Sequence, residues 1–166
     1  MFELKHLSKQ GIPAALARVE RYRLLNEPEQ AESICLDILA TEPDNHTALI
    51  SMLLAITEQL SGGTMKRISD ARALLPRLPS EYERVYYAGI ICERQARALL
   101  NHNRPGSGFV AYPWFREAMD WYEKAEALRP AGNDDAVLRW NTCARFLNRN
   151  PQLALQEERA EPITME

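Results

Sequence analysis

Residues 31–43 read AESICLDILATEP, and residues 118–130 read AMDWYEKAEALRP. In both segments a small residue is followed by a larger one four positions later, by another three positions after that, and by a proline after five more. These positions are Ala31, Cys35, Ile38 and Pro43, and Ala118, Tyr122, Ala125 and Pro130. Steps of three and four are typical of an α-helix that packs one stripe inward, and proline ends such a helix.

A weaker copy of this spacing occurs at Arg67, Ala71, Leu74 and Pro79, and the segments between the copies carry a second spacing. This second spacing begins at an apolar residue. The residues three, four and seven positions after it complete the pattern. The copies are Leu49, Met52, Leu53 and Ile56; Val85, Ala88, Gly89 and Cys92; Val137, Trp140, Asn141 and Ala144; and, more poorly, Ala15, Arg18, Val19 and Tyr22. The two spacings alternate along the chain, which predicts pairs of helices.

Proline, glycine and asparagine clusters separate the apolar stripes at regular places, and no segment alternates with the period of two that is typical of strands. We therefore predict an all-α fold. The expected helices are 12–26, 28–41, 45–61, 64–77, 80–103, 112–129 and 133–149. We expect residues 1–11 to form an N-terminal arm, with Phe2, Leu4 and Leu7 able to dock, and residues 150–166 to form a C-terminal extension that is partly disordered.

The two spacings and their alternation resemble the tetratricopeptide repeat (TPR) family, whose helix pairs recur every 34 residues. The first interval, from Ala15 to Leu49, matches that period, and Gly62-Gly63 lengthen the second by two residues. The third interval is longer, with most of the excess between Cys92 and Ala118. The resemblance implies three repeats plus a capping helix, an insertion in the third repeat, and an antiparallel helix-hairpin α-solenoid over residues 12–149.

Composition narrows the class of protein. The 166 residues carry a net charge of −3, and a nucleic-acid protein would show a basic excess. The N-terminus has no apolar run typical of a signal peptide, and the apolar stretches are too short to span a bilayer. Cys35, Cys92 and Cys143 are odd in number and lack metal-ligand spacing, which favours buried thiols in a reducing compartment. We expect a cytoplasmic protein with no nucleic-acid or membrane partner.

No pattern in the sequence indicates catalysis. His6, His46 and His102 are isolated, and there is no H-E-x-x-H, G-x-S-x-G, Walker or G-x-G-x-x-G motif. Gly106-Ser107-Gly108 lacks the lysine and hydroxyl residue that a phosphate loop needs. We therefore expect neither an enzyme nor a cofactor.

Aromatic residues gather in and after the insertion. They are Phe109, Tyr112, Trp114, Phe115 and Trp121, around a loop that we place at residues 101–112. Two interpretations stay open: the rings close over the long fifth helix and attach the insertion to the core, or the loop and some rings border a binding surface.

In the family that this chain resembles, the first helix of each pair lines a concave face that binds extended or helical peptides. Leu49, Val85 and Val137 begin the copies of the second spacing. The residues one and five positions after each of them would lie on that face, and Glu58, Glu93, Arg94 and Arg145 would lie further along the same helices. The candidate protein-binding residues are Ile50, Leu54, Tyr86, Ile90, Arg94, Leu138, Thr142 and Arg145. The function expected is a non-catalytic adaptor or chaperone-like binder of a protein or peptide; a self-associating structural subunit and a small-ligand binder at residues 101–115 are the alternatives.

Overall fold

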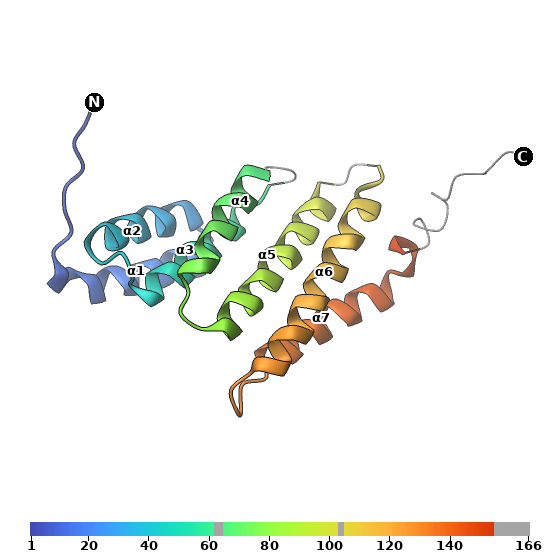
Figure 1. The fold of residues 1–166 in the computed structure, drawn as a ribbon. Helices are drawn as coiled ribbons and strands as arrows, with labels where there is room; N and C mark the ends of the chain where they lie inside the picture. The colour runs from blue at the N-terminus through green and yellow to red at the C-terminus, as the bar shows by residue number, and fades with distance from the viewer. Residues whose placement is uncertain (62–64, 103–104, 155–166) are drawn as a thin grey trace, which may run out of the picture. The chain divides into compact units, whose positions relative to one another are not determined.

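A computed structural model describes residues 1–61, 65–102 and 105–154 (Figure 1). Within these residues the chain is all-helical, as predicted, and carries no strand. Its α-helices are α1 (Ile12–Leu24), α2 (Pro28–Thr41), α3 (His46–Glu58), α4 (Met65–Leu74), α5 (Glu81–Asn101), α6 (Ser107–Leu128) and α7 (Asp135–Arg149), with short 3-10 helices η1 (Lys9–Gly11), η2 (Leu75–Arg77) and η3 (Pro151–Leu153). Gly62-Gly63 and most of the C-terminal extension, 155–166, lie outside the described residues.

The chain divides into two compact units. The first comprises Met1–Leu60 with Thr64–Ser80 and holds α1 to α4, while the second comprises Ser61–Gly63 with Glu81–Glu166 and holds α5 to α7. Each unit is described by itself.

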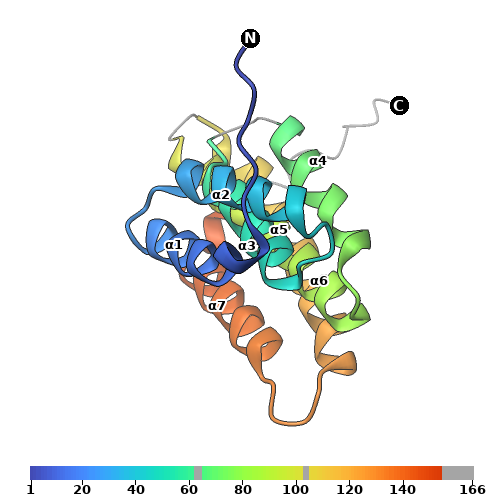
Figure 2. The same ribbon diagram turned by 90° about the vertical axis from the view of Figure 1, so that its left-hand side faces the viewer.

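The core of the first unit consists of the apolar residues that the sequence places at steps of three and four. Ala31, Cys35 and Ile38 of α2 are all fully buried, and they pack with Val19 of α1 and Ala48 of α3. Small residues at these positions let the helices approach closely, so α1, α2 and α3 lie side by side (Figure 2).

Two ion pairs join helices of the first unit that are about one repeat apart in sequence. Arg23 of α1 donates from Nε and Nη2 to the carboxylate of Glu58 of α3, at 2.6 to 3.2 Å. Arg67 of α4 donates from Nη1 and Nη2 to Glu32 of α2, which also accepts a 2.6 Å hydrogen bond from Gln59 Nε2. Each ion pair therefore connects a helix to the helix two further along the chain.

The second unit centres on α5 and α6, which run antiparallel along their length (Figure 1). Gly89 of α5 makes their close approach possible. A Cβ atom at this position would lie 2.6 Å from Cε1 and 2.8 Å from Cδ1 of Tyr122, which is fully buried on α6. The ring of Tyr122 therefore occupies the space that any other residue at position 89 would need.

A buried carboxylate lies one turn further along α5. Glu93 is 2% exposed; its Oε2 accepts a 2.7 Å hydrogen bond from the hydroxyl of Tyr122, and its Oε1 accepts two from Arg97, at 2.9 and 3.0 Å. Arg139 of α7 lies 3.6 Å from the same oxygen. Because a buried charge needs partners, this cluster fixes how α5, α6 and α7 meet. The sequence placed Glu93 on an open helix face, and the structure corrects that placement.

The sequence predicts the helices of the chain to within a few residues, except for the start of α6. We expected a loop to residue 112, but α6 begins at Ser107, after Gly106 with its left-handed φ of 84°. Pro113 lies inside the helix and is exposed. Ala111 and Phe115 flank Pro113 and are fully buried, so packing holds the helix together across the missing N–H group.

The N-terminal arm docks through one residue. Met1, Phe2 and Leu4 are exposed, whereas Leu7 packs against the core of the first unit and its carbonyl accepts a 3.1 Å hydrogen bond from Thr41 Oγ1. Docking of Phe2 and Leu4, which the sequence allowed, is absent from the structure. These two residues lie on an extended stretch that precedes the first backbone turn.

We predict that Gly89→Ala destabilises the protein by about 1–3 kcal/mol, because the added methyl group collides with the Tyr122 ring. Urea denaturation followed by circular dichroism measures this change. In a Tyr122→Leu background the ring is gone, and the same substitution should become neutral or stabilising because alanine favours a helix over glycine. Equal destabilisation in both backgrounds would contradict the close approach.

The Glu32–Arg67 pair predicts a specific acid sensitivity. Hydrogen bonds from Arg67 hold the pKa of the Glu32 carboxyl below its ordinary value of 4.5. The carboxylate therefore contributes stability that is fully present above that value and is lost as the pH falls through the lower folded-state pKa.

At pH 7, Glu32→Gln should lower the free energy of unfolding by about 1 kcal/mol, and the difference from the parent should shrink steadily below about pH 4.5. Urea denaturation at several pH values measures it. A difference that stays constant down to pH 2 would show that the ion pair contributes nothing.

Candidate functional site

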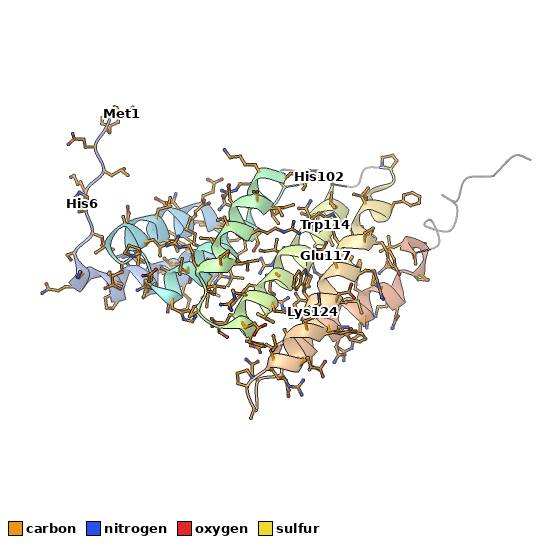
Figure 3. All side chains as sticks on the ribbon, in the orientation of Figure 1. Met1, His6, His102, Trp114, Glu117 and Lys124 are labelled. Carbon is orange, nitrogen blue, oxygen red and sulfur yellow. The ribbon has the colours of Figure 1, made fainter. Side chains whose placement is uncertain are left out.

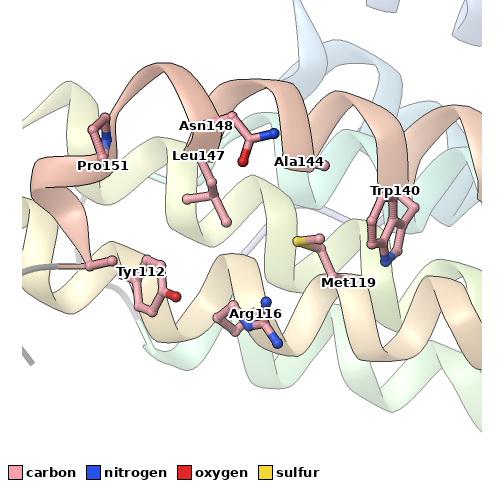
Figure 4. A pocket seen from close by; sticks show the side chains of 9 residues that line it. Tyr112, Arg116, Met119, Trp140, Ala144, Leu147, Asn148 and Pro151 are labelled. Atoms are coloured by element: carbon pink, nitrogen blue, oxygen red, sulfur yellow. The ribbon is translucent and has the colours of Figure 1, made fainter.

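An open groove runs between α6 and α7 in the second unit, with a volume of about 760 Å³ (Figure 4). Its lining residues come from the two helices and from the turn that follows α7. They are Tyr112, Arg116, Met119, Trp140, Ala144, Leu147, Asn148, Pro151 and Ala154. The groove is mainly apolar, with a charged side chain from α6 and an amide from α7.

The groove follows from the helical period of its two walls. Trp140, Ala144 and Leu147 are spaced by four and three residues on α7, so their side chains share one face. Ala144 lies between two large neighbours and leaves the space that forms the hollow. Tyr112, Arg116 and Met119 repeat the same spacing on α6, which places them on a second face opposite the first (Figure 4).

Specific contacts define the two ends of the groove. At one end the indole Nε1 of Trp140 donates a 3.0 Å hydrogen bond to Glu123 Oε1 of α6. At the other end Pro151 and Ala154 line the groove, and η3 packs closely on the start of α6. A Cβ atom at Gly108 would lie 2.5 Å from Cδ2 of Leu153, so glycine allows this approach.

Arg116 gives the groove its charge. The side chain is exposed and forms no ion pair with any residue in the described ranges. By contrast, Arg97 and Arg139 of the same unit both lie against Glu93. The groove therefore presents an uncompensated positive charge beside an apolar floor.

The structure brings together the candidate residues predicted on α7. Leu138, Thr142 and Arg145 are all exposed, and Leu138 reaches 61%. Their spacing of four and three places them on one face of α7, away from the residues that line the groove. Thr142 Oγ1 donates a 2.9 Å hydrogen bond to the carbonyl of Leu138, so it is partly engaged by its own helix.

The candidates on the other helices are less open. Ile90 is 2% exposed and offers no surface to a partner. Tyr86 is half-buried in a ring cluster with Tyr82, Tyr87 and Tyr122, at centroid distances of 5.1 to 5.9 Å. Burial raises the pKa of its hydroxyl, while Arg139 opposes the rise.

Arg94 of α5 is half-buried and already interacts with another residue of the chain. Ile50 and Leu54 belong to α3 of the first unit, where both are half-buried. The predicted set is therefore divided between the two units, and its exposed members are those of α7.

Nothing in the described part of the chain is arranged to hold a metal ion: no three His, Cys, Asp or Glu side chains come together there. His6 lies on the exposed N-terminal arm and His102 is exposed just after α5 (Figure 3). The three cysteines are free and buried, and burial raises the pKa of the Cys35 and Cys143 thiols to about 12. These thiols are protonated near neutral pH and are therefore poor nucleophiles.

The aromatic residues of the insertion have separate environments. Phe115 is fully buried and packs on Phe146 at 5.0 Å, with the Arg97 guanidinium 5.5 Å from each ring. Phe109 is 40% exposed, and Tyr112 lines the groove. The insertion thus lengthens the hairpin of α5 and α6 and also supplies one wall residue of the groove. Tyr112, Arg116 and Met119 all lie within the predicted helix 112–129, and their spacing of four and three could have indicated that wall.

Comparisons with protein-family models, with curated proteins and with solved structures give no match to this chain. None of the helices in the described ranges combines the length and the apolar composition that crossing a bilayer requires.

The environment of the thiols predicts their reactivity. At pH 8 in native buffer, Cys35, Cys92 and Cys143 should react with a disulfide reagent at least about a hundredfold more slowly than free cysteine, because all three are buried. Burial also raises the pKa of the Cys35 and Cys143 thiols to about 12, so these two are largely protonated at that pH. In urea all three should react at once. Rapid labelling of one thiol in the folded protein would reveal an activated cysteine and would contradict this assignment.

Proposed function

We propose that this protein is a non-catalytic interaction module, an adaptor or chaperone-like binder, that holds a segment of another protein. We also propose that its helices form a TPR-like solenoid and that it acts in the cytoplasm. The groove between α6 and α7 carries the proposal, since it is open and mainly apolar and bears Arg116, which forms no ion pair with the residues that the structure describes. Grooves of this kind between helices commonly receive an apolar helix face.

Contacts in the first unit support a repeating architecture there. The Arg23–Glu58 and Arg67–Glu32 pairs each join residues 35 positions apart, and Arg77 Nη2 donates to the carbonyl of Pro43 across 34 positions. Stacked repeats place equivalent positions of successive hairpins in contact, so separations near 34 residues are expected of such an array.

The exposed face of α7 offers a second binding surface. Leu138, Thr142 and Arg145 lie there, on the face that the sequence analysis selected. Leu138 is a large apolar side chain that is 61% exposed, and a partner could bury it. Paired substitutions on α7 distinguish this face from the groove.

We predict that Ala144→Phe abolishes capture of a partner from an extract of the native cells, because the new ring fills the groove. Thr142→Phe is the matched control, since it adds the same ring two residues away on the exposed face of α7. Affinity capture with mass spectrometry measures retention, and circular dichroism verifies that both variants fold.

Loss of a protein with Ala144→Phe alone supports binding in the groove. Loss with Thr142→Phe alone would move the binding site to the exposed face and keep the function. If every protein retained by the parent were retained equally by both variants, the interaction function would be wrong at both surfaces.

A further inference from the structure

The first unit shows which kind of element fills the site that is equivalent to the groove. There α4 packs on α3 and is joined to α2 by the Arg67–Glu32 ion pair. Its apolar stripe, Ile68, Ala71 and Leu74, is 0 to 5% exposed. In the described part of the second unit the one-turn η3 follows α7 at one end of the groove, and no α-helix takes the corresponding place.

The repeat spacings align the two sites residue by residue. Aligning Ala31 with Ala118 matches α2 to α6, and aligning Leu49 with Val137 matches α3 to α7. Ile56 of α3, which is 1% exposed, then corresponds to Ala144, which lines the groove. The α6–α7 groove is thus the equivalent of the site that α4 fills.

The charges at the two sites are reversed. On α2, Glu32 pairs with Arg67 of α4, and Glu29 also acts on that arginine electrostatically. In the alignment Glu29 corresponds to Arg116, and Glu32 corresponds to the apolar Met119. A basic helix therefore fits the first site, and an acidic helix fits the second.

We propose that the α6–α7 groove binds an amphipathic α-helix of a partner protein, with an apolar stripe against Met119, Ala144 and Leu147 and a carboxylate facing Arg116. The inference rests on the proposed function and adds the chemistry of the partner. The α7 wall from Trp140 to Asn148 is about 12 Å long at about 1.5 Å per residue, which accommodates about two turns of helix.

Charge and burial disfavour a second copy of the chain as the donor of that helix. The helix that fills the equivalent site, α4, carries Lys66, Arg67 and Arg72 against a single Asp70, so it would bring positive charge to Arg116. Its apolar stripe is also already buried in its own unit.

Two synthetic helices of about 14 residues test the proposal. Both keep the isoleucine, alanine and leucine spacing of α4; one carries glutamate at its exposed positions and the other carries lysine. Fluorescence anisotropy of the labelled peptides, titrated with the full chain at low salt, gives their dissociation constants. We expect the acidic peptide to bind at least about tenfold more tightly than the basic one.

Arg116→Glu should reverse this preference. Arg18→Glu is the matched control, because it makes the same change in net charge at an exposed position of α1 that belongs to neither proposed surface. Ala144→Phe should abolish binding of the acidic peptide. Both peptides could bind equally, with binding lost in Ala144→Phe and unchanged in Arg116→Glu. This result would overturn the preference for an acidic partner and would leave the proposed function intact. If neither peptide bound and no protein were captured through either the groove or the exposed face of α7, the proposed function would fail as well.

Two further outcomes would assign a different occupant to the groove. Either would overturn the proposal that a helix of a partner protein binds there. A chain ending at Ala154 could bind the acidic peptide tenfold more tightly than the full chain, which would identify residues 155–166 as a competitor for the groove. Alternatively, sedimentation could reveal a dimer that Ala144→Phe dissociates, which would identify a second copy. An unchanged affinity and a monomeric parent are the results that we expect.

Discussion

A helical hairpin has more than one apolar face, and it can bury only one of them by itself. Each further face needs the next helix of the chain. The fully buried Ala31, Cys35 and Ile38 of α2 illustrate the requirement, because α1 and α3 both contact α2. The same requirement reaches α7, whose groove face is left open in the described part of the second unit. The binding surface that we propose is therefore the apolar face of α7 that no α-helix covers among the described residues.

Size complementarity and a buried charge determine the packing in the second unit. Gly89 accepts the ring of Tyr122, and the hydroxyl of that ring reaches Glu93. The carboxylate in turn holds Arg97 and lies near Arg139, so that one acidic group connects three helices. Removing one member would leave a buried charge with fewer partners, which is costly, and the cluster therefore specifies a single arrangement of α5, α6 and α7.

The sequence predicts the helices well because their signals are local. Apolar residues at steps of three and four, and prolines after Ile38 and Ala125, require only neighbouring residues to interpret. The predicted start of α6 was wrong because Pro113 and the glycines before it disfavour a helix locally. Burial of Ala111 and Phe115 stabilises the helix by more than these residues destabilise it. Glu93 was placed on an open face because two of its partners, Tyr122 on α6 and Arg139 on α7, lie far away in sequence. The groove depends on the same long-range packing, so its walls could be predicted only one helix at a time.

Binding in the groove requires that the face of α7 bearing Trp140, Ala144 and Leu147 is exposed to solvent in the free protein. Hydroxyl-radical footprinting of the full chain tests it most directly, since oxidation of a side chain follows its contact with water. We expect Tyr112 and Trp140 to be oxidised readily, while Tyr122 and Phe115, which are fully buried, are protected. Protection of Tyr112 and Trp140 as strong as that of Tyr122 would contradict the account, because the groove would then already be filled.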